Sequence, residues 1–228
     1  MNIALIVFGG KGERISSDVP KQFIKIKGKD VVSYTISVFQ EHPLIDEIVL
    51  VCHKDYLNYT KQLVIINQFT KVRFVVPGGE TRQDSVREGL NATNYNDNDN
   101  ILIHDGDRPL VKTSIISQAL RLLDSVNACY PAIKSSEGIK IISNSGRKKE
   151  INGVSYDIQT PQCFKYKLIK DRHNRLKGET FSDDISLLEI LDEPVEMFIG
   201  DKYNFKVTLD RDLNYFRGLI ENDGREEA

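Results

Sequence analysis

Residues 3–21 read IALIVFGGKGERISSDVPK, an apolar run that leads directly into a glycine-rich loop. The run Ile3–Phe8 has the length and composition of a buried strand. Gly9, Gly10 and Gly12 can adopt positive φ, and consecutive backbone N–H groups in such a loop form an anion-binding concavity. We therefore predict a phosphate-binding loop after the first strand. The alternative is an ordinary glycine turn with solvated charges.

Two cationic residues, Arg14 and Lys21, lie beside this loop, and Pro20 restricts the backbone next to the lysine. An arginine fork and a lysine point charge suit the oxygens of a polyphosphate. Nucleotidyl transfer depends mostly on alignment and on positive charge placed where negative charge develops. We predict that Arg14 and Lys21 are catalytic and converge on the reacting phosphorus of a nucleoside triphosphate.

The composition of the 228 residues indicates a globular chain, 40% hydrophobic, with no stretch that approaches the ~20 apolar residues of a membrane span. We expect no secretory leader. Three scattered cysteines argue for a reducing compartment and against a disulfide framework or zinc site. A net charge of −2 provides no general attraction to nucleic acid. We expect a cytoplasmic protein without nucleic-acid or membrane partners.

Strand-like runs alternate with helical patterns along the first part of the chain. Strands are predicted at 3–8, 47–52, 71–76, 100–104 and 128–133, and helices at 31–41, 56–69, 84–93 and 113–126. This alternation predicts an α/β fold, a mostly parallel sheet with helices on both faces. Ligands in such sheets bind at the carboxyl ends of the strands. The loops GGKGER, PGGETR and HDGDRP follow the first, third and fourth strands, so we expect one shared site.

The pattern changes at about 134–158, where apolar runs at 138–142 and 154–158 flank a polar turn at 143–149. We predict a protruding β-arm that serves a homodimer, because a lone hairpin is only marginally stable; an unpartnered surface hairpin is the alternative. Further elements are predicted at 165–176 and 182–191 (helices, the second capped by Ser182), 195–199 (strand) and from Asp210 (helix). We assign 1–222 to one domain and 223–228 to a disordered tail.

The second glycine loop could hold a base or ribose through Gly79 and through Ser85 at a helix start; the alternative is a turn capped by Asp84 or Ser85. At the end of the fourth strand, Asp105 could hold Mg²⁺ through triphosphate oxygens or accept a substrate hydroxyl. Arg108 could reach a substrate phosphate. A loop salt bridge is the alternative for both.

Three features complete the candidates. We interpret His104 as a structural histidine rather than a general base. Lys206, expected on a short strand between apolar residues, is assigned to a second phosphate, with a snorkelling lysine as the alternative. The pair Asp183–Asp184 could bind metal, but a helix N-terminus that favours negative charge is the preferred interpretation.

Six segments taken together resemble the cytidylyltransferases that make CDP-linked polyols. The segments are GGKGERISSDVPKQF, GGETRQDSVREGL, ILIHDGDRP, QTPQCF, FSDDISLLE and NFKVT. The resemblance is to the 2-C-methyl-D-erythritol 4-phosphate cytidylyltransferases of isoprenoid synthesis and to ribitol-5-phosphate cytidylyltransferases. The shorter GG-x-G-x-R…PK pattern would also fit sugar-1-phosphate nucleotidyltransferases.

The resemblance implies a Rossmann-like three-layer sandwich of the nucleotidyltransferase type, Mg²⁺ and CTP as ligands, and a dimer through the β-arm. The glycine loop with Arg14 and Lys21 would bind the CTP phosphates. Cytosine and ribose would lie at Gly79, Glu80 and Ser85. The polyol phosphate would be bound by Asp105, Arg108, Asn152, Ser182 and Lys206, with Lys206 also catalytic and Asp105 the metal ligand.

Four departures from the family pattern concern the acceptor half of the site. Asn152 aligns with an arginine, Glu137–Gly138 replaces an Asp-Thr pair, Ser182 replaces a threonine, and Asp107 is an added negative charge. Nearby Arg147, Lys148 and Lys149 could substitute for the arginine. Methylerythritol phosphate and ribitol phosphate therefore both remain possible acceptors.

Two functions of other classes are alternatives to nucleotidyl transfer. A dinucleotide-dependent oxidoreductase would need G-x-G-x-x-G, which Gly9, Gly10 and Gly12 do not form, and its second strand would end in an acid rather than in Cys52–His53. A non-catalytic nucleotide-binding relative is suggested by Asn152 and Gly138.

Overall fold

The computed structural model describes residues 1–10, 15, 17, 19–136, 140–142, 148–150 and 153–223. Gly12, Arg14, Glu137, Gly138, Arg147, Asn152 and the tail beyond 223 lie outside the described residues, as do the predictions made for them. Within the described ranges, no helix is both long and apolar enough to cross a membrane.

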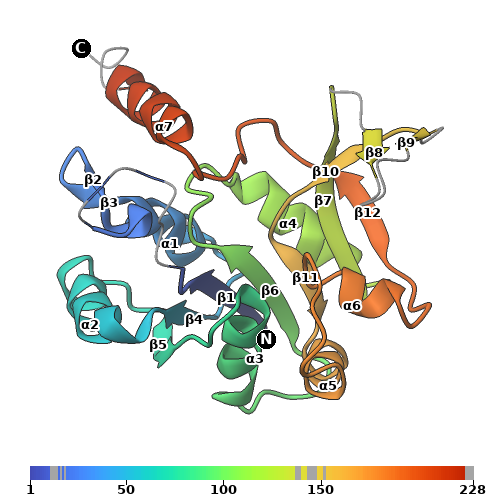
Figure 1. Ribbon diagram of the computed structural model, residues 1–228. Helices are drawn as coiled ribbons and strands as arrows, with labels where there is room; N and C mark the ends of the chain where they lie inside the picture. The colour runs from blue at the N-terminus through green and yellow to red at the C-terminus, as the bar shows by residue number, and fades with distance from the viewer. Residues whose placement is uncertain are drawn as a thin grey trace.

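One mixed sheet organises the chain (Figure 1). Its strands are β1 (Asn2–Phe8), β4 (Glu47–Cys52), β5 (Val72–Pro77), β6 (Asn100–Asp105), β7 (Ala128–Lys134), β10 (Tyr156–Ile158), β11 (Gln162–Lys165) and β12 (Glu196–Ile199). The order is β5-β4-β1-β6-β11-β7-β10, and β12 pairs with β7. The β5, β4, β1 and β6 neighbours are parallel, as is β12 with β7, whereas β10 and β11 run antiparallel to their partners.

Helices cover both faces of this sheet. They are α1 (Val31–Glu41), α2 (Leu57–Ile66), α3 (Arg82–Asn91), α4 (Thr113–Leu122), α5 (Tyr166–Arg175) and α6 (Ser186–Glu189). The helix α7 (Asp210–Asp223) packs against the start of α1 instead, and 3-10 turns are η1 (Lys21–Phe23) and η2 (Lys54–Tyr56). Short strands β2 (Lys25–Ile26) and β3 (Lys29–Asp30) pair with each other.

Alternation along β1 explains the two cores, because successive side chains point to opposite faces. Ala4, Ile6 and Phe8 pack with α1, α2 and α4, whereas Ile3 and Leu5 pack with α3, α5 and α6. A third cluster joins α7 to the first turn of α1. This arrangement confirms the predicted three-layer α/β sandwich.

The arm prediction is wrong in its pairing. The strand β8 (Lys140–Ile142) pairs with β9 (Lys148–Glu150), which lies partly in the predicted turn. Residues 156–158 instead form β10 of the main sheet, where a bond from the Ser135 N–H to the Ser155 carbonyl extends the pair. The sequence of two short apolar runs does not reveal their pairing, because either run could pair with the other or with a longer strand such as β7.

Three local predictions in the last third also need correction. The helix predicted from Ser182 is reduced to α6, whose first backbone donor at Ser186 is capped by Asp183. The strand β11 was not predicted, because its four residues follow the proline of QTPQCF and carry little periodicity. Lys206 lies on irregular chain rather than on a strand.

Helix α3 approaches the sheet closely at Gly89. A Cβ there would lie 2.6 Å from Leu5 Cδ1 and 2.7 Å from Val51 Cγ2, both in the buried core. We expect Gly89→Ala to destabilise the protein by about 1–3 kcal/mol through overpacking, measured by denaturant unfolding. The control is Gly218→Ala in α7, where nothing lies within 4 Å of the added atom. Helix propensity should make that variant up to ~1 kcal/mol more stable; equal effects would contradict the close packing.

Candidate functional site

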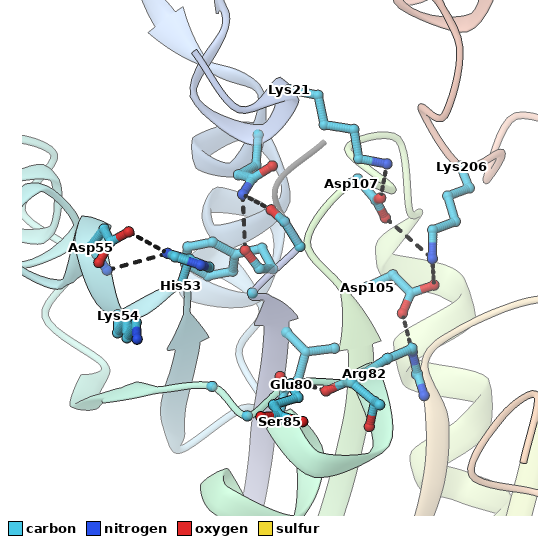
Figure 2. A pocket seen from close by; sticks show the side chains of 18 of the residues that line it. Lys21, His53, Lys54, Asp55, Glu80, Arg82, Ser85, Asp105, Asp107 and Lys206 are labelled. Atoms are coloured by element: carbon cyan, nitrogen blue, oxygen red, sulfur yellow. Dashed lines mark hydrogen bonds and ion pairs between the residues drawn. The ribbon is translucent and has the colours of Figure 1, made fainter. Parts of the chain in front are cut away.

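A cavity of about 1060 Å³ opens at the carboxyl ends of β1, β5 and β6 (Figure 2). Residues from all three predicted loops line it, together with the η2 turn. They are Val7, Phe8, Gly9, Gly10, Lys21, Gln22, His53, Lys54, Asp55, Gly78, Gly79, Glu80, Thr81, Arg82, Ser85, Asp105, Asp107, Lys206 and Thr208. The structure thus brings together the loops that the sequence analysis assigned to one site.

The loop after β1 is held by Gln22, whose amide donates to the carbonyls of Phe8 (3.0 Å) and Gly10 (2.8 Å). Neither Gly9 nor Gly10 uses the positive φ that glycine permits. A Cβ on Gly10 would meet no described atom within 4 Å. The missing side chain therefore leaves open space at the cavity wall, where a ligand can approach the backbone.

The second glycine loop is a capped turn that also forms cavity wall. Thr81 is the N-cap of α3 and Asp84 completes a capping box, so the predicted cap at Asp84 or Ser85 lies one turn too late. A Cβ on Gly79 would lie 2.4 Å from the Cβ of Asp84. The buried Ser85 hydroxyl donates to the Thr81 carbonyl (2.9 Å), and Glu80 is exposed at the rim.

Lys21 extends into the cavity with its stem buried. Its Nζ donates to the carbonyl of Val207 (2.7 Å) and forms an ion pair with Asp107 (2.5 Å). Both contacts reach Lys21 from distant parts of the chain. They show that the lysine following Pro20 is a built component of the site rather than a free surface group.

The carboxylate of Asp105 lies between Arg82 and Lys206 (Figure 2), and a third cation, Arg108, also approaches it. Arg82 Nε donates to its Oδ1 (2.8 Å), Lys206 Nζ donates to its Oδ2 (2.9 Å), and Arg108 Nε lies 3.5 Å from Oδ2. Burial by itself would raise the pKa of Asp105, but the charges of these three cations outweigh it and hold the pKa well below its usual range. Asp105 is therefore ionised at neutral pH.

Arg82 also binds a second buried carboxylate, that of Asp184 (2.8 Å). Asp184 in turn contacts His173 Nε2 (2.9 Å), and its backbone N–H donates to Gln162 (2.9 Å). The sequence analysis assigned no role to Arg82. One signal was present: it is the first residue of α3, and a cation at a helix N-terminus is unfavourable unless anions compensate it.

The described residues do not form a magnesium site by themselves. No group of three or more His, Cys, Asp or Glu side chains within the described ranges could hold an ion. Both oxygens of Asp105, the predicted ligand, already accept from cations. The carboxylates of Asp105, Asp107 and Asp184 are each paired with one or more of the cations Lys21, Arg82, Arg108 and Lys206, so their charge is compensated without a divalent cation.

A smaller cavity of about 180 Å³ adjoins the first and shares Arg82, Asp105 and Lys206 with it. Its other lining residues are Arg108, Ile158, Thr160, Gln162, Ser182 and Asp183. The Arg108 guanidinium is fixed by the carbonyl of Asn204 (2.7 Å), and the Ser182 hydroxyl donates to Asp183 (2.9 Å). The predicted acceptor residues Asp105, Arg108, Ser182 and Lys206 therefore meet in one place.

Polar side chains of the QTPQ segment tie the walls of this smaller cavity together. The Thr160 hydroxyl accepts from the Asp105 N–H (3.1 Å), and Gln162 accepts from the Asp184 N–H (2.9 Å). Gln159 donates to the Asp201 carbonyl (2.7 Å). Each bond joins a site-bearing loop to the strand β11 or to the residues just before it, which explains why this segment is polar although it is buried.

His104 is a structural residue, as the sequence analysis favoured. Its side chain is fully buried, contacts the Thr160 hydroxyl (2.9 Å) and the Arg108 carbonyl (3.3 Å), and lines neither of the two cavities. Burial lowers the pKa of His104 to about 3. It is therefore neutral near pH 7 and supports the smaller cavity through Thr160 and Arg108.

Arg82 generates a prediction about stability. Arg82→Met would leave the Asp105 and Asp184 carboxylates buried without this cation, so we expect a loss of about 3–5 kcal/mol in unfolding free energy. The control is Arg73→Met, which removes a 61% exposed arginine 3.5 Å from Glu47 and should cost less than about 1 kcal/mol. Similar losses in the two variants would show that the buried network does not support the fold.

His104 generates a prediction about pH. An unfolded histidine binds a proton below about pH 6.5, whereas the folded His104 does so only near 3. The stability from its neutral burial is complete above about pH 6.5 and is lost as the pH falls towards 3. Between about pH 7 and pH 5, the wild type should lose roughly 2 kcal/mol more than His104→Gln in urea unfolding. Parallel losses would contradict the buried neutral state.

Comparisons with known proteins agree with this geometry. The family description "IspD: 2-C-methyl-D-erythritol 4-phosphate cytidylyltransferase" matches residues 2–221. Relatives of that name from Clostridium perfringens and Clostridium novyi are 39% and 37% identical to the chain; the alignments cover 92% and 97% of it and 95% and 97% of the relatives.

Solved structures of proteins with these names also resemble the chain. The chain resembles the 4-diphosphocytidyl-2C-methyl-D-erythritol synthase of Anaerococcus prevotii with a TM-score of 0.83 and 28% identity, over 96% of each chain. It resembles the Francisella tularensis 2-C-methyl-D-erythritol 4-phosphate cytidylyltransferase with a TM-score of 0.77 and 25% identity, over 95% of this chain and 98% of that one. The chain therefore belongs to the 2-C-methyl-D-erythritol 4-phosphate cytidylyltransferase family.

Proposed function

We propose that this chain transfers CMP from CTP to 2-C-methyl-D-erythritol 4-phosphate and releases pyrophosphate. Membership of the family supports the reaction class and the isoprenoid pathway. The observation that carries the proposal is the group of cations at the carboxyl ends of β1 and β6, where Lys21 and Lys206 line a cavity bordered by two glycine loops. Such a group suits a triphosphate.

CTP is assigned to the larger cavity, whose volume lies just above the range typical of ligand sites, ~300–1,000 Å³. Its phosphates would lie against the backbone of Gly9 and Gly10 and near the ammonium of Lys21. Cytosine and ribose would contact the opposite wall at Gly79, Glu80 and Ser85, largely through backbone groups. Gly12 and Arg14 remain part of the proposal as phosphate ligands, and Arg14 as a catalytic residue.

The acceptor phosphate is assigned to the smaller cavity, where Arg108 and Ser182 offer donors. Asn152 remains a proposed contact. The two cavities meet at Arg82, Asp105 and Lys206, so the reacting phosphorus and the attacking oxygen would come together there. Lys206 and Arg82 are therefore the two described cations that line both cavities, and Lys206 is the one proposed to act on both substrates.

The chemistry follows from this placement. An oxygen of the acceptor phosphate attacks the α-phosphorus of CTP and forms a new P–O bond. The bond between that phosphorus and the oxygen bridging to the β-phosphate breaks, and pyrophosphate leaves. Because a phosphate monoester is substantially ionised at neutral pH, no general base is required. Lys21 and Lys206 would stabilise the negative charge that develops on the transferred group.

Three further features belong to the proposal. Magnesium would enter with the triphosphate and neutralise part of its charge, since the described carboxylates are already compensated. The protein would be cytoplasmic and would form a homodimer through the arm that contains the β8–β9 pair. The two substrates are its expected partners.

The identity of the acceptor is the part of the proposal that the site residues specify least, because Ser182 and Asp107, which line the cavities, depart from the family pattern. Ribitol 5-phosphate is therefore the second candidate acceptor. A sugar-1-phosphate acceptor and a non-catalytic nucleotide-binding role are further alternatives, to be separated by experiment.

A pyrophosphate-release assay tests the proposal. Each nucleoside triphosphate is paired with methylerythritol 4-phosphate, ribitol 5-phosphate and a sugar 1-phosphate in the presence of Mg²⁺. We expect turnover with CTP and methylerythritol phosphate. Turnover confined to another pair would replace the assigned substrates, and CTP binding without any turnover would favour the non-catalytic alternative.

In the same assay, Lys21→Met and Lys206→Met should each lower kcat/KM by roughly 100-fold or more, corresponding to about 3 kcal/mol of transition-state stabilisation. The matched control is Lys167→Met, an exposed lysine paired with Asp97 beside the start of β6. Full activity of either cavity variant would remove that lysine from the mechanism.

A further inference from the structure

Asp107 is a carboxylate placed among the cations of the nucleotide cavity, two residues after β6 ends. Its Oδ2 pairs with Lys21 Nζ at 2.5 Å, and its Oδ1 lies 3.8 Å from Lys206 Nζ. Figure 2 shows it between these two lysines. The residue is 9% exposed and lines the larger cavity, so the pair with Lys21 is only weakly screened by water.

The ammonium of Lys21 is largely occupied by this arrangement. It has three N–H donors, of which one goes to the Val207 carbonyl and another to Asp107. The backbone strengthens the contact, because the Val207 N–H donates to the Asp107 carbonyl (2.8 Å). The lysine is thus held against a carboxylate in the ligand-free chain.

Asp107 is poorly explained as a purely structural residue. Its buried Oδ1 has no hydrogen-bond donor among the described residues, which is unfavourable for a charged oxygen. Asp105 already compensates Lys206, with a bond of 2.9 Å. The remaining contact of the carboxylate is with Lys21, the cation to which the proposed function assigns the CTP phosphates.

We propose that Asp107 is an internal counter-ion that competes with the substrate's phosphates for Lys21. The inference rests on the proposed function. A phosphate oxygen that takes the position of the carboxylate must displace it from Lys21, and the remaining negative charge repels the bound polyphosphate. Asp107 thereby weakens the binding of CTP and of inorganic pyrophosphate, and it speeds the release of pyrophosphate after transfer.

The test is a calorimetric titration with inorganic pyrophosphate in metal-free buffer, comparing the full chain with Asp107→Asn. The amide keeps the shape and can still accept from Lys21, but it removes the charge. We expect the Kd for pyrophosphate to fall roughly tenfold or more. The matched control is Asp97→Asn, which removes the same charge from an exposed pair with Lys167 and should leave the Kd unchanged. An unchanged or higher Kd in Asp107→Asn overturns the proposal.

A double-mutant cycle tests whether the effect passes through Lys21. In a Lys21→Met background there is no ammonium to compete for. The decrease in the pyrophosphate Kd caused by Asp107→Asn should therefore be several-fold smaller than in the wild-type background. An equal decrease in Kd in both backgrounds overturns the proposal, because the carboxylate would then act by net charge alone. Asp107→Ala repeats the titration if the asparagine variant folds poorly.

The outcomes separate this inference from the proposed function. If pyrophosphate binds equally to wild type and Asp107→Asn while the wild type turns over CTP, the proposed competition by Asp107 is wrong and the proposed function is supported. If the wild type neither binds pyrophosphate nor turns over CTP, both fail.

Discussion

The rest of the site depends on the ionised carboxylate of Asp105. Arg82, Arg108 and Lys206 come from three separate parts of the chain and would repel one another without an anion between them. Asp105 supplies that anion from the end of a central strand, where its position is determined by the sheet. The cations gathered by the acids, Lys21, Arg82 and Lys206, line the larger cavity, where a phosphate ligand can contact them. A single buried acid thus both assembles the cations and leaves them capable of binding.

Much of the polar sequence outside the cavities serves to hold this arrangement. The QTPQ segment reaches Asp105 through Thr160 and the Asp184 loop through Gln162, so a short antiparallel strand fixes two acids at once. The Gln22 amide fixes the loop after β1 by donating to the carbonyls of Phe8 and Gly10. Backbone groups that would otherwise be buried without partners are satisfied by these amides and hydroxyls. The precision of the site is therefore a property of the scaffold around it as well as of the residues that line it.

The successes and failures of the sequence analysis have a common physical origin. Buried strands such as β1 and β4 were predicted within a residue, because continuous apolar runs bounded by turns reflect burial on both faces. The pairing of 138–142 with 154–158 was wrong, and β11 was missed, because short segments acquire their strand character from neighbours distant in sequence. Neither Gly9 nor Gly10 uses the positive φ that glycine permits, and at Gly10 the glycine leaves open space instead. A glycine in a sequence does not reveal which of its properties is used.

The sequence by itself determined the α/β alternation and the edge of the sheet at which function would be found, since the carboxyl ends of parallel strands converge whatever the details of packing. It also pointed to Lys21, from the Pro-Lys pair beside the glycine loop, and to Lys206, from its place between apolar residues. Only the tertiary structure decided which charges meet. Arg82 contacts Asp184 across 102 positions of sequence, and Lys206 contacts Asp105 across 101. Likewise, the pairing of Lys21 with Asp107 arises from folding alone, because spacing along a chain carries no information about which distant side chains share a cavity.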